Sequence, residues 1–313
     1  MHAGALSWRN HNWLPMPSLT YHLTLLVLRL TGIKRIFNQN PIPYQTLRKN
    51  DVYKPQGSFY NKHIQRAFQV ENTTITVIRR DQNSPRLLIF LHGGAFVSGP
   101  AQHHWNIAKQ ICQQTDHTIW MCNYPKAPEH QIGEISSNVD AMYAEARKAY
   151  ETANITIIGD SVGGTLATAL VQRLITRGIP VPGRLILVTP VMDATMSNPE
   201  ILTIDQTDPM LSKAGVLSAK QLCAGNTDLA DPMISPIQGE FEGFPPTLLF
   251  LASCDIMYPD GKQAAVKMKE AGVSLTVIEG AKMPHIWPFL PVMKEAGMAL
   301  EEIIEKVAQT SSS

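Results

Sequence analysis

The sequence is poor in the features that mark metalloproteins and disulfide-stapled proteins. Its 313 residues include only four cysteines, without a regular spacing, and contain neither a C-x-x-C pair nor an H-E-x-x-H motif. Those motifs bring metal ligands together at fixed spacing. His103, His104 and His130 therefore do not predict a metal site, and we expect no cofactor. A chain of this length can bury its own core, so it does not require disulfides.

The sequence also lacks an excess of charge. Lys and Arg number 27 and Asp and Glu number 26, which gives a formal net charge of +1. Such a balance produces no overall field that attracts nucleic acid or an anionic surface. We expect no nucleic-acid partner.

Long apolar runs are absent as well. The strongest apolar peak, residues 23–30, is interrupted by Arg29 and falls far short of the roughly 20 residues that a membrane span needs. It predicts a helix that packs against protein, without stable membrane insertion. Residues 1–5 lack the basic and apolar regions of a signal peptide, so a cytoplasmic location is the expectation.

One six-residue segment carries the strongest functional signal: Gly159-Asp160-Ser161-Val162-Gly163-Gly164. An apolar run, residues 155–158, precedes it, and a helix-forming run, residues 165–170, follows it. G-x-S-x-G between a strand and a helix is typical of a nucleophile elbow, in which the flanking glycines relieve the crowding of a sharp turn. The pattern predicts that the Ser161 hydroxyl is exposed to attack a carbonyl group.

A second glycine-containing loop lies upstream. The apolar run 87–91 leads directly into His92-Gly93-Gly94-Ala95-Phe96. Acyl transfer builds negative charge on the carbonyl oxygen, and fixed backbone N–H groups can stabilise that charge. The amides of Gly93, Gly94 and Ala95, with that of Val162 after the serine, are therefore the candidate oxyanion hole.

With these two motifs the chain resembles the hormone-sensitive-lipase-like (GDXG) branch of the α/β-hydrolases, whose pattern is H-G-G-G/A followed by G-D-S-A-G-G. Residues 124–130 and 231–236 also resemble segments of that family. Ala95 stands where the last loop glycine is usual and Val162 stands in place of Ala, but both keep their backbone donors, whereas the effect of Lys126 is not predicted. The resemblance implies an α/β-hydrolase fold with a mostly parallel sheet, helices on both faces and a helical cap.

The resemblance also implies an acid and a base that follow the serine in the chain. Asp255 lies just past the apolar run 247–252 and matches the family's acid, and His285 follows the run 274–278 and matches its histidine. Asp260 and Asp193 also lie near strand ends, but loop aspartates most often serve turns or helix caps, and we expect Asp260 to cap the helix that follows. Asp160 is expected to orient the elbow.

Apolar spacing of three and four residues predicts helices at 104–114, 138–151, 162–177, 261–271 and 292–307. Strands are expected only from about residue 74. We therefore divide the chain into an N-terminal part of the cap (1–60), a first catalytic part (61–192), a second part of the cap (193–243) and a second catalytic part (244–313).

These features together predict a serine carboxylesterase that acts on short- to medium-chain acyl esters of little charge. A lipase or amidase with the same triad remains an alternative, because pocket shape selects the leaving group. A ligand-binding receptor on a hydrolase fold is the alternative from another class, although such relatives typically lose a triad member. We also allow for a homodimer.

Overall fold

The computed structural model describes residues 7–10, 17–80, 84–290 and 292–309. Their strands form a nine-stranded sheet in the order β1-β9-β8-β7-β6-β4-β5-β3-β2. All neighbours are parallel except β3 with β5 and β2 with β3. The strands are β1 (Ser7–Asn10), β2 (Ile64–Val70), β3 (Thr73–Ile78), β4 (Leu87–Leu91), β5 (Thr118–Asn123), β6 (Ile155–Asp160), β7 (Arg184–Val188), β8 (Thr247–Ala252) and β9 (Leu275–Gly280).

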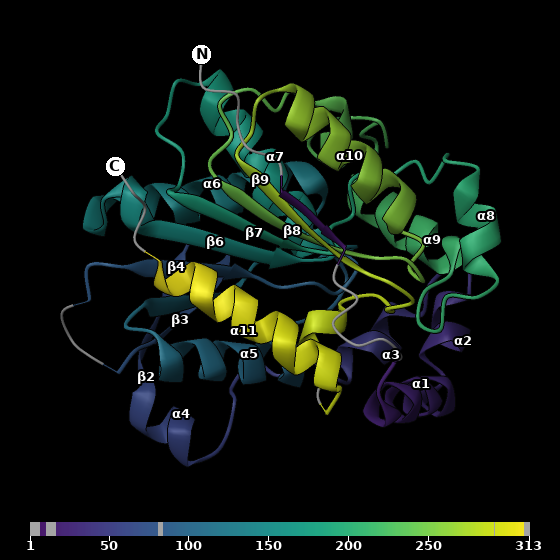
Figure 1. The fold of residues 1–313 in the computed structure, drawn as a ribbon. Helices are drawn as coiled ribbons and strands as arrows, with labels where there is room; N and C mark the ends of the chain where they lie inside the picture. Colours follow the sequence, from purple (N-terminus) through teal and green to yellow (C-terminus); the bar gives the residue numbers. More distant parts are fainter. Residues whose placement is uncertain (1–6, 11–16, 81–83, 291, 310–313) are drawn as a thin grey trace.

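Helices cover both faces of this sheet, with α5 and α11 on one face and α6, α7 and α10 on the other (Figure 1). The helices are α1 (Leu19–Thr31), α2 (Ile33–Phe37), α3 (Tyr44–Arg48), α4 (Ser58–His63), α5 (Gln102–Gln114), α6 (Ile132–Ala149), α7 (Val162–Thr176), α8 (Glu200–Asp205), α9 (Lys213–Ala224), α10 (Tyr258–Glu270) and α11 (Lys294–Ala308), with 3₁₀ turns η1 (Thr152–Asn154), η2 (Pro236–Gln238) and η3 (Trp287–Phe289). None of the described helices is long and apolar enough to cross a membrane.

The central strands are buried along their whole length. Every residue of β4, β6 and β8 is buried, which is why each strand reads as a continuous apolar run rather than an alternating one. This architecture confirms the predicted α/β-hydrolase fold, and the five predicted helices appear as α5, α6, α7, α10 and α11 with shifted ends.

The expectation that strands begin near residue 74 is wrong at two places. β2 precedes that point, and it is an edge strand whose side chains are only partly buried, so it gives a weak apolar signal. β1 pairs in parallel with β9, which places residues 7–10 in the sheet and not in a cap. Helix α4 packs against β2, so it too lies apart from the other N-terminal helices (Figure 1).

The two remaining pieces of the predicted cap meet each other. Helix α2 contacts α9, and a Cβ added to Gly215 at the start of α9 would overlap the backbone of Phe37. A glycine is therefore needed at this position for the close approach of the two backbones.

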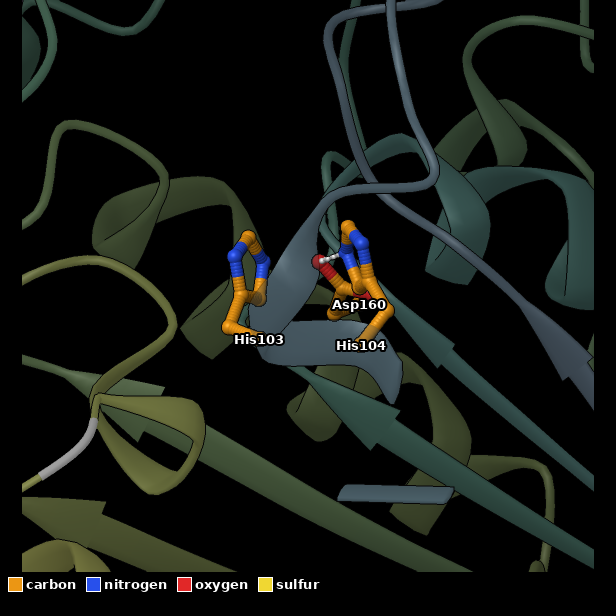
Figure 2. A group of neighbouring side chains, drawn as sticks. All are labelled: His103, His104 and Asp160. Atoms are coloured by element: carbon orange, nitrogen blue, oxygen red, sulfur yellow. Dashed lines mark hydrogen bonds and ion pairs between the residues drawn. The ribbon is translucent and has the colours of Figure 1, made fainter. Parts of the chain in front are cut away.

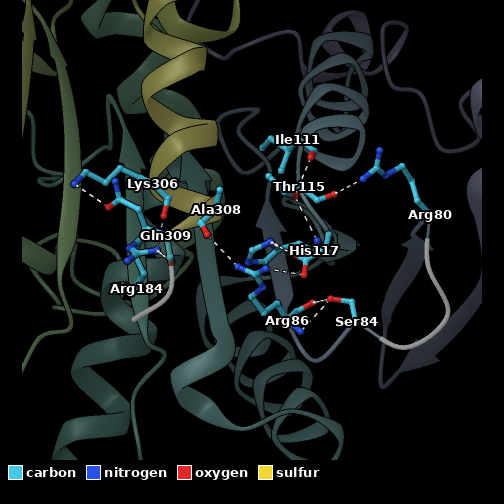
Figure 3. Close-up of polar contacts among 11 residues, drawn as sticks. Arg80, Ser84, Arg86, Ile111, Thr115, His117, Arg184, Lys306, Ala308 and Gln309 are labelled. Carbon is cyan, nitrogen blue, oxygen red and sulfur yellow. Dashed lines mark hydrogen bonds and ion pairs between the residues drawn. The ribbon is translucent and has the colours of Figure 1, made fainter. Parts of the chain in front are cut away.

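Two arginines fix the end of α11 to the sheet (Figure 3). Arg86 donates to Ala308 O at 3.0 Å, and Arg184 donates to Gln309 O at 3.0 Å and to Lys306 O. These carbonyls are among those that a helix C-terminus leaves without internal partners. α11 is thus held in place in the layer that also contains α5, whose first turn contributes to the site below.

Candidate active site

Ser161 occupies a strained turn between β6 and α7. Its backbone has φ 52° and ψ −123°, and its N–H donates to Val188 O at 2.9 Å. A Cβ on Gly163 would overlap Leu91 O, and one on Gly159 would overlap Gly163 O. Both glycines of the predicted elbow are therefore required sterically. Strain of this kind is typical of functional sites.

Three of the four predicted oxyanion-hole amides are free. Among the described residues, the N–H groups of Gly94, Ala95 and Val162 have no hydrogen-bond acceptor. All three residues line the same cavity as Ser161. Their amides are therefore available to a substrate oxygen.

Gly93 is the exception and corrects the prediction. Its N–H donates to Asp160 Oδ1 at 3.0 Å, so this amide is already satisfied. A Cβ on Gly93 would overlap Asp160 Oδ2, which explains the need for glycine there. The Gly93–Asp160 contact ties the loop of residues 92–96 to the turn at Ser161, as the orienting role expected for Asp160 requires.

The Asp160 carboxylate is buried and faces the His104 imidazole ring (Figure 2). His104 Nε2 lies 3.3 Å from Asp160 Oδ2, and His104 Nδ1 accepts from the N–H of Ala101 at 2.8 Å. Nδ1 is therefore unprotonated and Nε2 carries the proton that it donates to Asp160. Burial raises the pKa of Asp160, but attraction to His104 and its hydrogen bond outweigh burial, so the net shift of this pKa is downward.

His103, His104 and Asp160 are close enough together to be considered as metal ligands. His104 does not fit that role, because the nitrogen that faces Asp160 carries a proton and has no lone pair for a metal ion. The Nε2 atom of His103 is buried without a hydrogen-bond partner among the described residues. Burial lowers the pKa of His103 to about 3, so this ring is neutral.

Asp255 and His285 form a close pair. His285 Nδ1 lies 2.7 Å from Asp255 Oδ2, and the N–H of Met257 donates to Asp255 Oδ1 at 2.9 Å. Burial lowers the pKa of His285, but attraction and hydrogen bonding to Asp255 outweigh burial and raise this pKa above its usual value. The chain presents Asp255 after β8 and His285 after β9, which are neighbouring strands.

Ser161 and His285 line the same cavity. No hydrogen bond joins these two described side chains, and catalytic hydrogen bonds are often long before a substrate binds. The cavity has a volume of about 160 Å³, and residues of the two predicted cap pieces, among them Phe37, Leu211 and Val216, supply much of its apolar wall.

Asp208 is a buried residue near this site that the sequence did not reveal. Its carboxylate accepts from the N–H groups of Met210 and Leu211 at 2.8 Å and of Ile256 at 3.0 Å. Burial, followed by repulsion from Asp255, raises the pKa of Asp208 to about 6. An aspartate before Pro209 reads only as a turn residue, so no local signal distinguishes it.

Asp193 and Asp260, the other two aspartates considered as the acid, do not contact the histidine. Neither Asp193 nor Asp260 is bonded to His285, whereas Lys220 donates to Asp193 O at 2.8 Å. Asp260 does not cap α10 as expected, since that helix begins at Tyr258 and has no side-chain cap. Burial lowers the pKa of Lys220 to about 7.

Lys126, for which no effect was predicted, supports the loop side of the cavity. It donates to Asn123 Oδ1 and to Tyr124 O. Its charge also interacts with Asp51, whose Oδ1 accepts from the N–H of Gly99 at 2.6 Å.

Comparison with known proteins identifies the family. The sequence pattern of a family described as alpha/beta hydrolase fold matches residues 88–289, more than half of the chain. The chain is an α/β-hydrolase. The match covers the loop of residues 92–96, Ser161, Asp255 and His285.

Curated relatives of this α/β-hydrolase include an acetyl-hydrolase from Streptomyces hygroscopicus, 25% identical over 74% of this chain and 78% of the relative. An esterase from Acinetobacter venetianus is 30% identical over 63% of this chain and 66% of the relative. A solved esterase from the bacterial hormone-sensitive lipase family superposes with a TM-score of 0.81 at 23% identity, covering 95% of this chain and all of the other. The hydrolase is thus similar to esterases and acetyl-hydrolases, and it shares its fold with an esterase of the hormone-sensitive lipase family.

Proposed function

We propose that this enzyme is a serine carboxylesterase that hydrolyses short- to medium-chain acyl esters through Ser161, His285 and Asp255. The observation that carries the proposal is the Asp255–His285 pair at 2.7 Å, because it opens on the cavity that Ser161 and three free amides also line. A nucleophile, a base with an orienting acid, and an oxyanion hole then face one substrate position.

The roles follow from this arrangement. His285 takes the proton of the Ser161 hydroxyl as the oxygen attacks the ester carbonyl, and Asp255 holds the imidazole in the tautomer that leaves Nε2 free to accept it. The N–H groups of Gly94, Ala95 and Val162 stabilise the oxyanion. The alcohol leaves with the proton from His285, and water then hydrolyses the acyl-enzyme by the same steps in reverse order.

The size of the cavity supports a preference for esters with small acyl groups. About 160 Å³ is below the ~300–1,000 Å³ of typical drug-sized ligand sites. The apolar wall from the two cap pieces suits an uncharged acyl chain and excludes water. The similarity to the acetyl-hydrolase of Streptomyces hygroscopicus points in the same direction.

An assay of p-nitrophenyl esters of graded acyl length tests the proposal. We expect activity to be highest for short and medium chains and to fall as the acyl group outgrows the cavity. Ser161→Ala should fold normally and lose roughly a millionfold in kcat. Binding of esters without turnover by the wild-type protein would instead favour a receptor, and preferred cleavage of amides or of long triglycerides would favour an amidase or a lipase.

A further inference from the structure

Helix α1 presents an apolar stripe to solvent. Leu19, Leu23, Leu26, Val27 and Leu30 are 87%, 53%, 52%, 49% and 77% exposed. They occupy positions i, i+4, i+7, i+8 and i+11, which form one side of a helix. Single exposed leucines are ordinary, but a continuous apolar stripe marks an interaction surface.

The opposite side of α1 is already anchored to the protein. Tyr21 and Thr24 are buried, and the Tyr21 hydroxyl donates to Lys282 O at 3.0 Å. At the start of the helix, the Ser18 hydroxyl donates to Glu295 Oε2 at 2.9 Å. These contacts fix the rotation of α1, so the helix cannot turn to bury its leucines.

A further exposed apolar residue lies near the first turn of the helix. Val292, which is 75% exposed, lies two residues before Lys294, whose backbone N–H donates to Thr20 Oγ1 at 3.0 Å. The loop that carries Val292 is therefore adjacent to the first turn of α1.

The N-terminal segment that contains this stripe carries side-chain charge of one sign. The first 50 residues of the chain contain six Lys and Arg and no Asp or Glu. Arg29 and Arg35 are exposed, and neither side chain forms an ion pair or hydrogen bond with a described residue. An apolar stripe flanked by free cations complements a surface that offers both acyl chains and negative charge.

We propose that the exposed side of α1 docks the enzyme peripherally on a bilayer surface that contains anionic phospholipid. The leucines enter the boundary between headgroups and acyl chains, and Arg29 and Arg35 lie among the phosphates. A two-fold pairing of α1 with a second copy fits less well, because it would bring the basic segments of both copies together.

Docking in this orientation brings the cavity to the lipid. Helix α2 follows α1 after Gly32, and its Ile33 and Phe37 line the cavity that contains Ser161. A sparingly soluble ester dissolved in the bilayer would therefore reach the pocket over a short apolar path.

Vesicle flotation of the full chain tests the surface without reference to catalysis, so failure of the proposed esterase function would leave this result readable. We expect the protein to float with mixed phosphatidylglycerol and phosphatidylcholine vesicles, to bind pure phosphatidylcholine more weakly, and to dissociate as salt is raised. A protein that stays unbound at low salt would overturn the proposal.

Two variant pairs assign the binding to this face. Leu26→Gln/Leu30→Gln should lower the partition coefficient by at least about tenfold, whereas Leu202→Gln/Val266→Gln, which alters exposed apolar side chains on α8 and α10, should not. Arg29→Gln/Arg35→Gln should remove the preference for anionic vesicles, and Lys262→Gln/Lys269→Gln on α10 should keep it. All variants should retain the melting temperature and the hydrolysis of a soluble short-chain ester.

If a second copy of the chain, and not a bilayer, covers α1, the experiments give a different result. If sedimentation shows a concentration-dependent dimer that Leu26→Gln/Leu30→Gln dissolves, while vesicles bind neither protein, α1 is an interface between copies and the proposal is wrong. Equal flotation of the leucine variant and the wild type would also contradict it.

Discussion

Asp208 Oδ2 accepts a hydrogen bond of 3.0 Å from the backbone N–H of Ile256, the residue that follows Asp255. The same carboxylate holds the N–H groups of Met210 and Leu211, and both of these residues line the cavity. Asp208 thus links the substrate-pocket wall to the loop that carries the proposed catalytic acid. Its charge also contributes to the raised pKa of His285.

Replacing Asp208 with Asn should change the pH dependence of the enzyme. The base acts when neutral, so kcat/KM should rise with pH through a His285 pKa that is raised above about 6.5. Removing the negative charge of Asp208 lowers that pKa, so the acidic limb should move to lower pH by less than about one unit. A pH profile of kcat/KM from 5 to 9 measures the shift.

Asp231→Asn is the matched control for this prediction. Asp231 also accepts a backbone N–H, that of Met233 at 2.8 Å, in the same segment between β7 and β8, but it does not line the cavity. Asp231→Asn should therefore leave the acidic side of the kcat/KM pH profile at its wild-type position. If Asp208→Asn leaves the acidic side of the pH profile unshifted, Asp208 supports only the folded structure and does not influence the pKa of His285.

Gly163→Ala should damage the elbow itself. The added methyl would overlap the carbonyl oxygen of Leu91, so the loop and the helix must separate. We expect a loss of several kcal/mol in the free energy of unfolding, in the upper range for single substitutions, together with a loss of activity.

Gly297→Ala tests whether that loss is specific. Gly297 lies in α11 with open space where its Cβ would be, so alanine there should stabilise the protein by about 0.5–1 kcal/mol. Urea unfolding of both variants compares them directly, and similar stabilities would contradict the steric account of the elbow.

His104 and His103 provide a second matched pair. His104→Phe removes the donor to the buried Asp160 carboxylate, which should cost about 1–3 kcal/mol of unfolding free energy at pH 7. The pKa of Asp160 is lowered in the fold, so its stabilising contribution is present above its unfolded pKa and disappears as pH falls through the folded value. The difference between wild type and variant should therefore shrink in strongly acidic solution.

His103→Phe should have a much smaller effect on stability, because His103 Nε2 has no partner to lose among the described residues. Chemical denaturation at pH 7 and at acidic pH compares the two variants. Equal losses would show that the His104–Asp160 contact contributes little.

The fold and the candidate site could be predicted from the sequence wherever a local pattern determines the structure. Continuous apolar runs located the buried strands β4, β6 and β8, and the crowded turn around Ser161 demanded its glycines. Asp255 and His285 are brought together because they follow neighbouring parallel strands, so the resemblance and the strand order pointed to the pair.

What the sequence could not provide depends on contacts between distant residues. The four residues of β1 have no apolar run and become a strand only by pairing with β9. The N–H of Gly93 is not available to the proposed oxyanion hole, because it donates to the carboxylate of Asp160, 67 positions away. Asp208 meets Ile256 across 48 positions, and no local motif records that contact.

The choice of acid remains the sharpest test of the proposed mechanism. Asp255→Asn keeps the size of the side chain but offers an amide to His285 Nδ1, which enforces the wrong imidazole tautomer and should lower kcat by roughly ten-thousandfold. Asp260→Asn alters another buried carboxyl, in the first turn of α10, yet Asp260 has no bond to His285, so kcat should stay within a few-fold of wild type. Because burial raises the pKa of Asp260 to about 6, we expect its surroundings to accept a neutral side chain, and melting temperatures should confirm that both variants are folded. If the ten-thousandfold loss falls on Asp260→Asn instead, the assignment of Asp255 as the acid is wrong.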